Sequence, residues 1–275
     1  MRLTQEQLRS YEEEGFVLIP DLFAQTEVDL LKAELPRIFS DDSPRRVVEK
    51  EGYATRSVYG SHLVNDLCDR LTRHPKLLEP AKQILDDDVY VYQFKINAKV
   101  AFQGDVWEWH QDYIFWREED GMPTPRATSV AIFLDEVTEF NGPLFLIPGS
   151  HREGVIEVEA YDGRSDGNGA YKNSPEWISN LTADLKYSID TDKVSDLVER
   201  YGIAAPKGKA GYAIFFHGNV VHASTINISP FSRTVVIITY NSVTNIPLSV
   251  AQPRPDFLAS RDYSPIKPLI NNDLM

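Results

Sequence analysis

Hydrophobic and polar residues follow two different periods along this chain, and the period changes near residue 88. Before that point apolar residues recur every three to four positions, a spacing typical of amphipathic helices. This spacing predicts three helices, over residues 4–14, 25–39 and 61–85. Thr4, with Gln7 three residues later, has the sequence of a capping box at the start of the first helix. The third is expected to break or restart at Pro75.

The second part of the chain has the pattern of short strands. A first strand is expected over the apolar residues that follow Gly15, whereas residues 41–60 are polar and predicted to be irregular. Alternating or β-rich segments then predict strands over residues 89–100, 129–137, 143–147, 211–216 and 233–241. Helices that precede short strands in one domain favour a β-sandwich or barrel with the helices packed outside. We therefore divide a single domain of residues 1–275 into a helical part (1–88), a β core (89–245) and a C-terminal tail (246–275).

Residues 152–200 interrupt the run of strands. Their centre is polar and rich in glycine, which predicts a long surface loop, with a helix near residues 190–200. A long excursion inside a compact domain is typical of a lid or binding loop. The alternative interpretation is a solvated insertion without a role.

Composition narrows the classes of function. The 275 residues carry a net charge of −13, with a pI of about 4.9, which disfavours binding to nucleic acids. No apolar run approaches the roughly 20 residues of a membrane span, and the polar N-terminus lacks a signal core. Cys68 is the single cysteine, so no internal disulfide forms and a metal would need histidine and carboxylate ligands. We expect a cytoplasmic protein without a membrane or obligate protein partner.

His110 and Asp112 are the most informative pair among the polar residues. If they lie on one strand, residues two apart point to the same face, which places an imidazole beside a carboxylate. A second histidine would complete the set of two histidines and one carboxylate that holds non-haem Fe(II). Aromatic residues surround the pair and suit an enclosed site. The alternative interpretation is an aromatic core with a polar edge.

The third ligand and an anion-binding residue have candidates in the last strands. His217 and His222 are five residues apart, so on one strand they face opposite sides and only one joins the site. Spacing alone leaves both open. Arg233 opens the final strand and is suited to hold a carboxylate through two parallel hydrogen bonds. Its alternative interpretation is a surface arginine.

Three segments carry a resemblance to a known family. They read WHQDYIFWREEDGMPTPRATSVAIFL from Trp109, NGPLFLIPGSH from Asn141 and HASTINISPFSR from His222. In this order they resemble the phytanoyl-CoA dioxygenase-type Fe(II)/2-oxoglutarate oxygenases, and most nearly the ectoine hydroxylases and free L-leucine 5-hydroxylases. The resemblance implies a double-stranded β-helix, the cupin-like jelly roll, with the N-terminal helices outside. It also implies Fe(II) as cofactor, with 2-oxoglutarate and O₂ as cosubstrates.

The resemblance also implies roles for individual residues. The histidine of the HxS segment binds iron in this family, which favours His222 over His217. The arginine eleven residues later, Arg233, anchors the distal carboxylate of 2-oxoglutarate. The cosubstrate site is implied to include Gln93, Lys95, Asn97, Ser129 and Ser224. Candidate substrate residues are Trp116, Arg126 and Arg56. Ectoine hydroxylases have Arg where this chain has Lys95, whereas the leucine-type enzymes have Lys.

These features together predict an oxygenase that hydroxylates an unactivated C–H bond and releases succinate and CO₂. The intact carboxylate of Asp112 favours hydroxylation over halogenation, because related halogenases lack that ligand. A free aliphatic amino acid such as L-leucine is the first expectation for the substrate, and a mycosporine-like or ectoine-like metabolite is the second. A non-catalytic jelly-roll protein that binds a small molecule is the alternative from another class.

Overall fold

The computed structural model describes residues 1–49, 54–161, 176–181, 185–269 and 274. Six α-helices lie within these residues: α1 (Gln5–Glu14), α2 (Gln25–Phe39), α3 (Asp66–Thr72), α4 (Pro75–Leu85), α5 (Asp112–Asp120) and α6 (Thr191–Tyr201). Short 3₁₀ turns cover Ser61–Leu63, Ser150–Glu153 and Glu176–Leu181. The strands are β1 (Phe16–Ile19), β2 (Arg46–Val48), β3 (Thr55–Tyr59), β4 (Val89–Lys99), β5 (Trp107–His110), β6 (Ala127–Phe133), β7 (Leu144–Leu146), β8 (Ala213–His217), β9 (His222–Ser224) and β10 (Arg233–Ser242).

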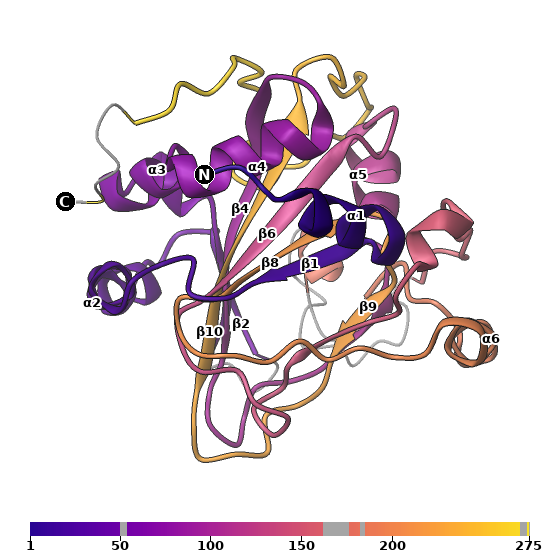
Figure 1. Cartoon of the computed structure of the whole chain (residues 1–275), viewed down its shortest axis with the longest axis horizontal. Helices are drawn as coiled ribbons and strands as arrows, with labels where there is room; N and C mark the ends of the chain where they lie inside the picture. Colours follow the sequence, from indigo (N-terminus) through magenta and orange to yellow (C-terminus); the bar gives the residue numbers. More distant parts are fainter. Residues whose placement is uncertain (50–53, 162–175, 182–184, 270–273, 275) are drawn as a thin grey trace.

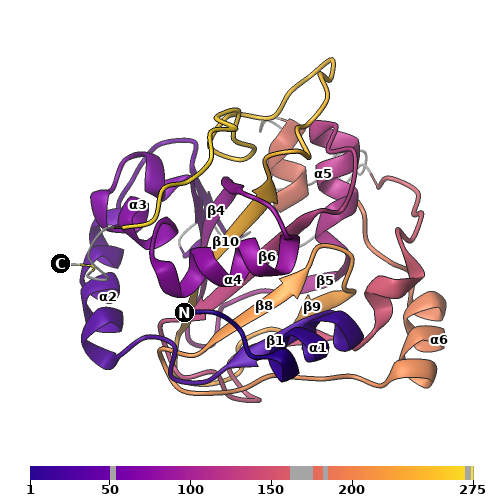
Figure 2. The same ribbon diagram turned by 45° about the horizontal axis from the view of Figure 1, so that its top comes forward.

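Two antiparallel sheets form the core of the fold. The large sheet has the strand order β1-β8-β6-β10-β4-β3-β2, and the small one has the order β5-β9-β7. Helices α2, α3 and α4 lie against one face of the large sheet, and the small sheet lies on the other side (Figures 1 and 2). This arrangement is the predicted one, mainly β with helices outside.

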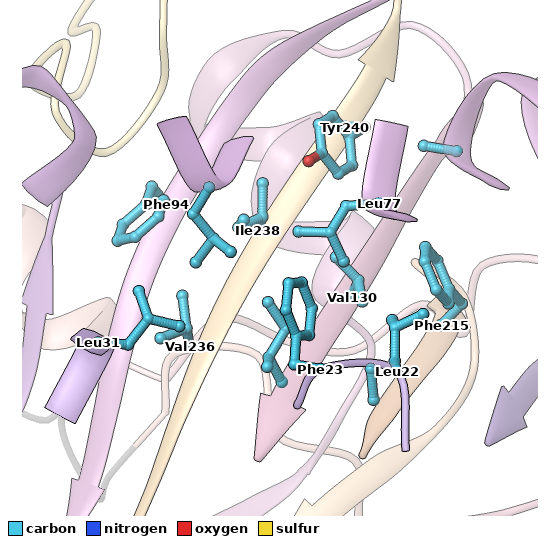
Figure 3. Close-up of a cluster of buried hydrophobic side chains, with 14 of the residues drawn as sticks. Leu22, Phe23, Leu31, Leu77, Phe94, Val130, Phe215, Val236, Ile238 and Tyr240 are labelled. Carbon is cyan, nitrogen blue, oxygen red and sulfur yellow. The ribbon is translucent and has the colours of Figure 1, made fainter. Parts of the chain in front are cut away.

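The face of the large sheet toward the helices carries the main hydrophobic core. Leu31 and Leu77 from the helices pack there against Phe94, Val236 and Ile238 from the central strands (Figure 3). Because side chains alternate along a strand, the residues between these apolar ones point to the opposite face of the sheet. That opposite face lines a cavity between the two sheets.

A β-bulge in β4 decides which residues reach the cavity. In the pairing with β10, Thr239 lies opposite Gln93 and Tyr240 lies opposite Val91, so Tyr92 is an extra residue. The bulge shifts the alternation by one position. As a result the polar residues Gln93, Lys95 and Asn97 line the cavity, and Phe94 faces the helices.

Several element predictions are confirmed and one is corrected. Thr4 and Gln7 form the capping box of α1, and α4 begins at Pro75. Residues 41–60 are less irregular than predicted, because the buried strand β3 pairs with β4 and extends the large sheet. Helix α6 confirms the helix expected near 190–200. The centre of the predicted surface loop, with its expected lid, lies outside the described residues.

The described part of the predicted C-terminal tail includes a strap along β4, at residues 254–266. Backbone amides of Ser260 and Ile266 donate to the carbonyls of Tyr92 (2.9 Å) and Val89 (2.9 Å). Leu258 is fully buried, and its carbonyl accepts a hydrogen bond of 2.8 Å from Gln93 Nε2. The strap therefore brings residues near 254–260 to the cavity.

Stability is expected to fall on acidification through His62, whose ring stacks on Phe94 at 5.3 Å. Burial lowers the pKa of His62 to about 4, whereas an unfolded chain has a histidine pKa near 6.5. Between these values the unfolded state binds more protons, so this stability is present above about pH 6.5 and lost toward pH 4. The variant His62→Gln should lose at most about 3 kcal/mol of that pH dependence.

The measurement is urea unfolding of both proteins from pH 4.5 to 7.5. The two proteins are compared by the slope of the free energy of unfolding against pH, because the other histidines contribute equally to both slopes. Parallel pH profiles would contradict the expected role of His62.

Candidate active site

Two histidines and one aspartate meet between the sheets. His110 ends β5 and His222 begins β9, and the antiparallel pairing of these strands places the two residues opposite each other. Asp112 Oδ1 lies 3.9 Å from His110 Nε2, and Asp112 Oδ2 lies 4.0 Å from His222 Nε2. All three side chains are buried, and one ligand atom of each lies within 4.8 Å of the others.

The local structure of His110 and Asp112 differs from the strand that the sequence suggested. β5 stops at His110, Gln111 is the N-cap residue, and Asp112 begins α5. The Gln111 side chain fixes this turn, because Nε2 donates to the carbonyls of Gly154 (2.8 Å) and Asn219 (2.7 Å). The carboxylate thus reaches the site from a strand-to-helix turn, and an acidic residue is favourable in the first turn of a helix.

Each histidine is oriented by a carbonyl of its own strand or turn. His110 Nδ1 lies 2.6 Å from the Glu108 carbonyl oxygen, and His222 Nδ1 lies 3.0 Å from that of Val220. A carbonyl only accepts, so each Nδ1 carries the proton and each Nε2 offers its lone pair. Burial, with a smaller effect of His222, lowers the pKa of His110 to about 3, which keeps the ring neutral.

Asp112 is the third donor for a metal, and it is suited to this role when its carboxyl group is ionised. Burial opposes ionisation, but the charge of the neighbouring Lys95 favours the carboxylate, and the carboxyl pKa is lowered. Asp112 Oδ2 is buried without a hydrogen-bond partner among the described residues. Two neutral imidazole nitrogens, one carboxylate and an orphaned oxygen fit a divalent iron with open coordination positions.

His217 lies outside this group. Its Nδ1 accepts a hydrogen bond of 3.0 Å from the Asn219 amide, and its ring lies 5.3 Å from that of His151. The structure therefore brings His222, and not His217, to His110 and Asp112.

One end of the cavity holds two buried basic side chains. Arg233 donates to the Gly142 carbonyl and the Ser224 hydroxyl, while its Nε has no partner among the described residues. Lys99 Nζ donates to the carbonyls of Thr225 (2.6 Å) and Asp105. Burial and then the charge of Arg233 lower the pKa of Lys99 to about 6. Among the described residues no carboxylate forms an ion pair with either side chain, so this end is suited to an anion, which would favour the protonated form of Lys99.

The remaining predicted cosubstrate residues are placed unevenly. Gln93, Lys95, Asn97 and Ser224 all line the cavity, and Lys95 Nζ lies 3.7 Å from Asp112 Oδ1. Ser129 points to the same side of the sheet, but it is fully buried and its hydroxyl pairs with Thr239 at 2.9 Å. Ser129 therefore does not line the cavity, which corrects its predicted position.

The three predicted substrate residues also separate. Trp116 lines the cavity together with Asp112 and Phe115, because positions three and four apart share one face of α5. Arg126 does not line it: the side chain is 47% exposed and donates to the Leu85 carbonyl at 3.0 Å. The expectation that Arg126 lies near the cavity is corrected.

Arg56 lies behind the cavity wall instead of facing the substrate space. Its guanidinium stacks on the Trp107 ring, 3.7 Å from the ring centre, and Trp107 lines the cavity. Arg56 also donates to Glu49 (3.1 Å) and to the carbonyls of Leu181 (3.1 Å) and Val106 (2.7 Å). With 1% exposure it holds two wall segments together, which corrects its predicted role as a substrate contact.

Two basic residues of the cavity were not among those predicted from the sequence. Lys99 continues the two-residue spacing of Gln93, Lys95 and Asn97, so this spacing could have revealed it. Arg254 reaches the cavity from the C-terminal strap and forms a buried ion pair with Asp120, whose other hydrogen bond comes from Tyr92. No local signal marks Arg254, because its position depends on the strap.

Comparisons with known proteins agree with this geometry. The sequence signature of the family described as Phytanoyl-CoA dioxygenase (PhyH) matches residues 11–235. The chain is 40% identical to an L-proline trans-4-hydroxylase from Streptomyces griseoviridis, over 94% of this chain and 93% of that protein. It is 37% identical to an ectoine dioxygenase from Bordetella bronchiseptica, over 97% of this chain and 86% of that protein.

Solved structures extend the similarity to the fold. Crystal structures of EctD from S. alaskensis in its apoform and with bound Fe superpose with TM-scores of 0.80 and 0.79, at 30% identity, each over 97% of this chain and 87% of that chain. The match confirms the predicted jelly-roll class. No helix among the described residues has the length and apolar character needed to cross a bilayer.

The Arg56–Glu49 pair gives a test of the cavity wall. Arg56→Met leaves the Glu49 carboxylate buried without its cation, and should lower the free energy of unfolding by about 3–5 kcal/mol. Adding Glu49→Gln should recover part of this loss, because no uncompensated charge remains. Arg45→Met, which breaks a partly exposed pair with Asp41, is the control and should cost less than about 1 kcal/mol. Strictly additive losses in urea unfolding would contradict the pairing.

Proposed function

Because this chain belongs to the phytanoyl-CoA dioxygenase family, we propose that it is an Fe(II)- and 2-oxoglutarate-dependent hydroxylase of a free amino acid. One observation carries the proposal. The buried group of His110, Asp112 and His222 has the donor atoms of an iron site and faces a cavity. Arg233 and Arg254 line this cavity at two separate places.

The three ligands would hold iron through His110 Nε2, His222 Nε2 and the Asp112 carboxylate. Bound Fe(II), with 2-oxoglutarate and O₂, supplies the oxidation of an unactivated C–H bond with release of succinate and CO₂. Because Glu108 and Val220 fix the two imidazoles, the nitrogens are in place before the metal arrives. Trp107, Phe115, Trp116, Phe216, Leu181 and Leu185 form an apolar wall that excludes water.

The cationic end is proposed as the site of the distal carboxylate of 2-oxoglutarate. Arg233 would bind it through the guanidinium. The carboxylate would raise the lowered pKa of Lys99 on the neighbouring strand, so that Lys99 adds a second charge. Ser224 holds the Arg233 side chain in place from β9. Arg233 and Lys99 are already buried. A carboxylate that enters would therefore give each of them a charged hydrogen-bond partner.

Arg254 is proposed to bind the carboxylate of the amino acid. Asp120 occupies one edge of its guanidinium with hydrogen bonds of 2.9 Å and 2.5 Å, and the side chain still borders the cavity. An arginine held in this way is pre-organised, so less side-chain entropy is lost when substrate binds. Lys95, beside Asp112, would orient the rest of the molecule.

Two observations support a free amino acid as the substrate: the relative named for L-proline, and the presence of Lys95. The relative named for L-proline makes L-proline and aliphatic amino acids of similar size, such as L-leucine, the first candidates. An ectoine-like or mycosporine-like zwitterion is the second candidate, supported by the relatives named ectoine dioxygenase. Lys95 favours an amino acid as substrate. By the resemblance, ectoine hydroxylases have Arg at this position, whereas the leucine-type enzymes have Lys.

The proposed activity is tested by succinate release with Fe(II), 2-oxoglutarate and one substrate at a time: L-proline, L-leucine or ectoine. One amino acid should stimulate turnover well above the rate without substrate. His222→Ala should abolish turnover and Fe(II) binding, whereas His217→Ala should retain both, because His217 lies outside the site. Stimulation by ectoine alone would replace the first substrate candidate with the second. No stimulation by any of them, with tight binding of one, would support a non-catalytic binding protein.

A pair of arginine variants separates the two carboxylate sites. Arg254→Lys keeps the charge opposite Asp120 but loses the planar fork, so KM for the amino acid should rise about 10- to 150-fold. KM for 2-oxoglutarate should stay within a few-fold of the native value. Arg233→Lys should show the reverse. Steady-state kinetics with each compound varied separately measures both constants, and equal effects of both variants on both constants would refute the assignment.

A further inference from the structure

The bulge in β4 places two consecutive side chains on the cavity side of the large sheet. Val91 belongs to the core under the helices, whereas Tyr92 packs with Trp116 and Gln93 lines the cavity. Regular alternation would send Gln93 to the same face as Val91, so the bulge is what lets Tyr92 and Gln93 share one side. Bulges that redirect a side chain are over-represented next to active sites. Tyr92 lies behind the cavity-lining residues, and its place beside the site needs an explanation.

The Tyr92 hydroxyl is bound to a carboxylate that also holds Arg254. It donates to Asp120 Oδ2, which accepts from Arg254 Nη2 as well, while Asp120 Oδ1 accepts from Arg254 Nε at 2.9 Å. All three side chains are buried. Burial, and then the charge of Asp120, raise the pKa of Tyr92, so the phenol stays protonated and remains a donor. A buried series of charge-assisted hydrogen bonds therefore runs from β4 to the guanidinium at the cavity wall.

The chain on either side of Arg254 gives its side chain limited support. Residues between 247 and 253 line a second hollow together with Tyr92 and Asp120, so they cross open space and not a filled core. The strap first bonds to β4 beyond Arg254, at Leu258 and Ser260. A long side chain on such a segment has many rotamers, and holding one of them needs a fixed partner. Asp120 is that partner, and Tyr92 fixes its carboxylate from a central strand of the sheet.

We propose that Tyr92 is a positioning residue for the substrate: its hydroxyl fixes the Asp120 carboxylate, and Asp120 in turn sets the angle of the Arg254 guanidinium. This inference rests on the proposed function, in which Arg254 binds the carboxylate of the amino acid. Asp120 occupies the guanidinium edge formed by Nε and Nη2, which leaves the edge formed by Nη1 and Nη2 for the substrate. A rotation of Asp120 would turn that edge away from the substrate carboxylate, and bidentate binding depends on its direction.

One substitution removes the hydroxyl and leaves the packing of the ring. The Tyr92 ring lies edge-on to that of Trp116, with 5.5 Å between the ring centres, and phenylalanine keeps this contact. Asp120 keeps both hydrogen bonds from Arg254 in Tyr92→Phe, so no buried charge loses its partner. The variant should therefore fold like the native protein, and it isolates the effect of one hydrogen bond on the guanidinium.

The first test is steady-state kinetics with the amino acid that stimulates turnover. In Tyr92→Phe the KM for this amino acid should rise about 10-fold, the worth of one hydrogen bond to a charged group. Both kcat and the KM for 2-oxoglutarate should stay within about 2-fold of the native values, because a positioning effect on Arg254 acts on substrate binding. In an Arg254→Gln background, Tyr92→Phe should change the KM by less than about 2-fold, because the guanidinium is already absent.

Tyr187→Phe is the matched control. The Tyr187 hydroxyl donates at 2.7 Å to Glu119, the neighbouring carboxylate on α5, and Glu119 pairs with Lys186 instead of Arg254. This variant loses the same kind of hydrogen bond from the same helix, and its KM for the amino acid should be native. An equal rise of KM in Tyr92→Phe and Tyr187→Phe would indicate a general loosening of α5 and overturn the proposal.

A second measurement is independent of turnover. With Zn(II) in place of iron, NMR of arginine-labelled protein follows hydrogen exchange at Arg254 Nε–H, whose signal is assigned by its absence in Arg254→Lys. Exchange should be about 10-fold faster in Tyr92→Phe and native in Tyr187→Phe, because only the first variant frees Asp120. Native exchange in Tyr92→Phe, a native KM, or a rise of KM that persists in the Arg254→Gln background would refute the positioning role. Failure of the proposed function differs from these results: no amino acid would then stimulate the native protein, and the exchange rates would still test Tyr92.

Discussion

The pairing of β5 with β9 is the constraint on which the candidate site depends. The two strands have only four and three residues, yet their register places His110 directly opposite His222. A shift of one residue would turn one imidazole to the other side of the sheet. Each ring is further fixed by a carbonyl two residues earlier in the chain, from Glu108 and Val220. Two short strands thus determine both where the nitrogens lie and which nitrogen is free.

A cavity rich in basic side chains within an acidic protein follows from the large sheet. Lys95 and Lys99 share one face of β4, Arg233 begins the neighbouring β10, and Arg254 comes from the strap beside β4. Asp112 is the one carboxylate among the described residues that line the cavity. Low-dielectric walls strengthen the attraction of Arg233 for an anion, so small anionic molecules are favoured inside while the outer surface repels polyanions. The net charge of the chain therefore says little about its ligands.

The sequence predicts the parts of the fold that depend on local patterns. The capping box at Thr4, the restart at Pro75 and most strands of the core follow from periodicity and breaker residues. Long-range packing decides the rest. β3 is in a sheet because β4 offers an edge, although its own residues alternate poorly. The bulge at Tyr92 is set by pairing with β10, so a simple alternation assigns the wrong face to part of the strand.

The site shows the same division between local and long-range information. Spacing selected His110 and Asp112, although the assumed strand is a strand-to-helix turn. Choosing between His217 and His222 needed the resemblance, because five residues of separation leave both sides open. Arg56 and Arg126 show the limit of that transfer: one arginine holds the wall from behind and the other lies at the surface. Arg254 was missed because only the folded strap brings it to the cavity.

The anion-binding end of the cavity is built from loops 138–142 and 225–232, which are bound to each other. Gly142 has a φ of 74°, and a Cβ at this position would lie 2.6 Å from Lys99 Cδ and 2.7 Å from the Thr225 carbonyl oxygen. Glycine at 142 therefore lets the loop approach Lys99 while its carbonyl accepts from Arg233. The same close approach fixes the neighbouring Phe140, whose carbonyl binds the Ile228 amide on the outside. Movement of these loops would displace the Gly142 and Thr225 carbonyls that hold Arg233 and Lys99, so the stiffness of the loops keeps the anion-binding end in place.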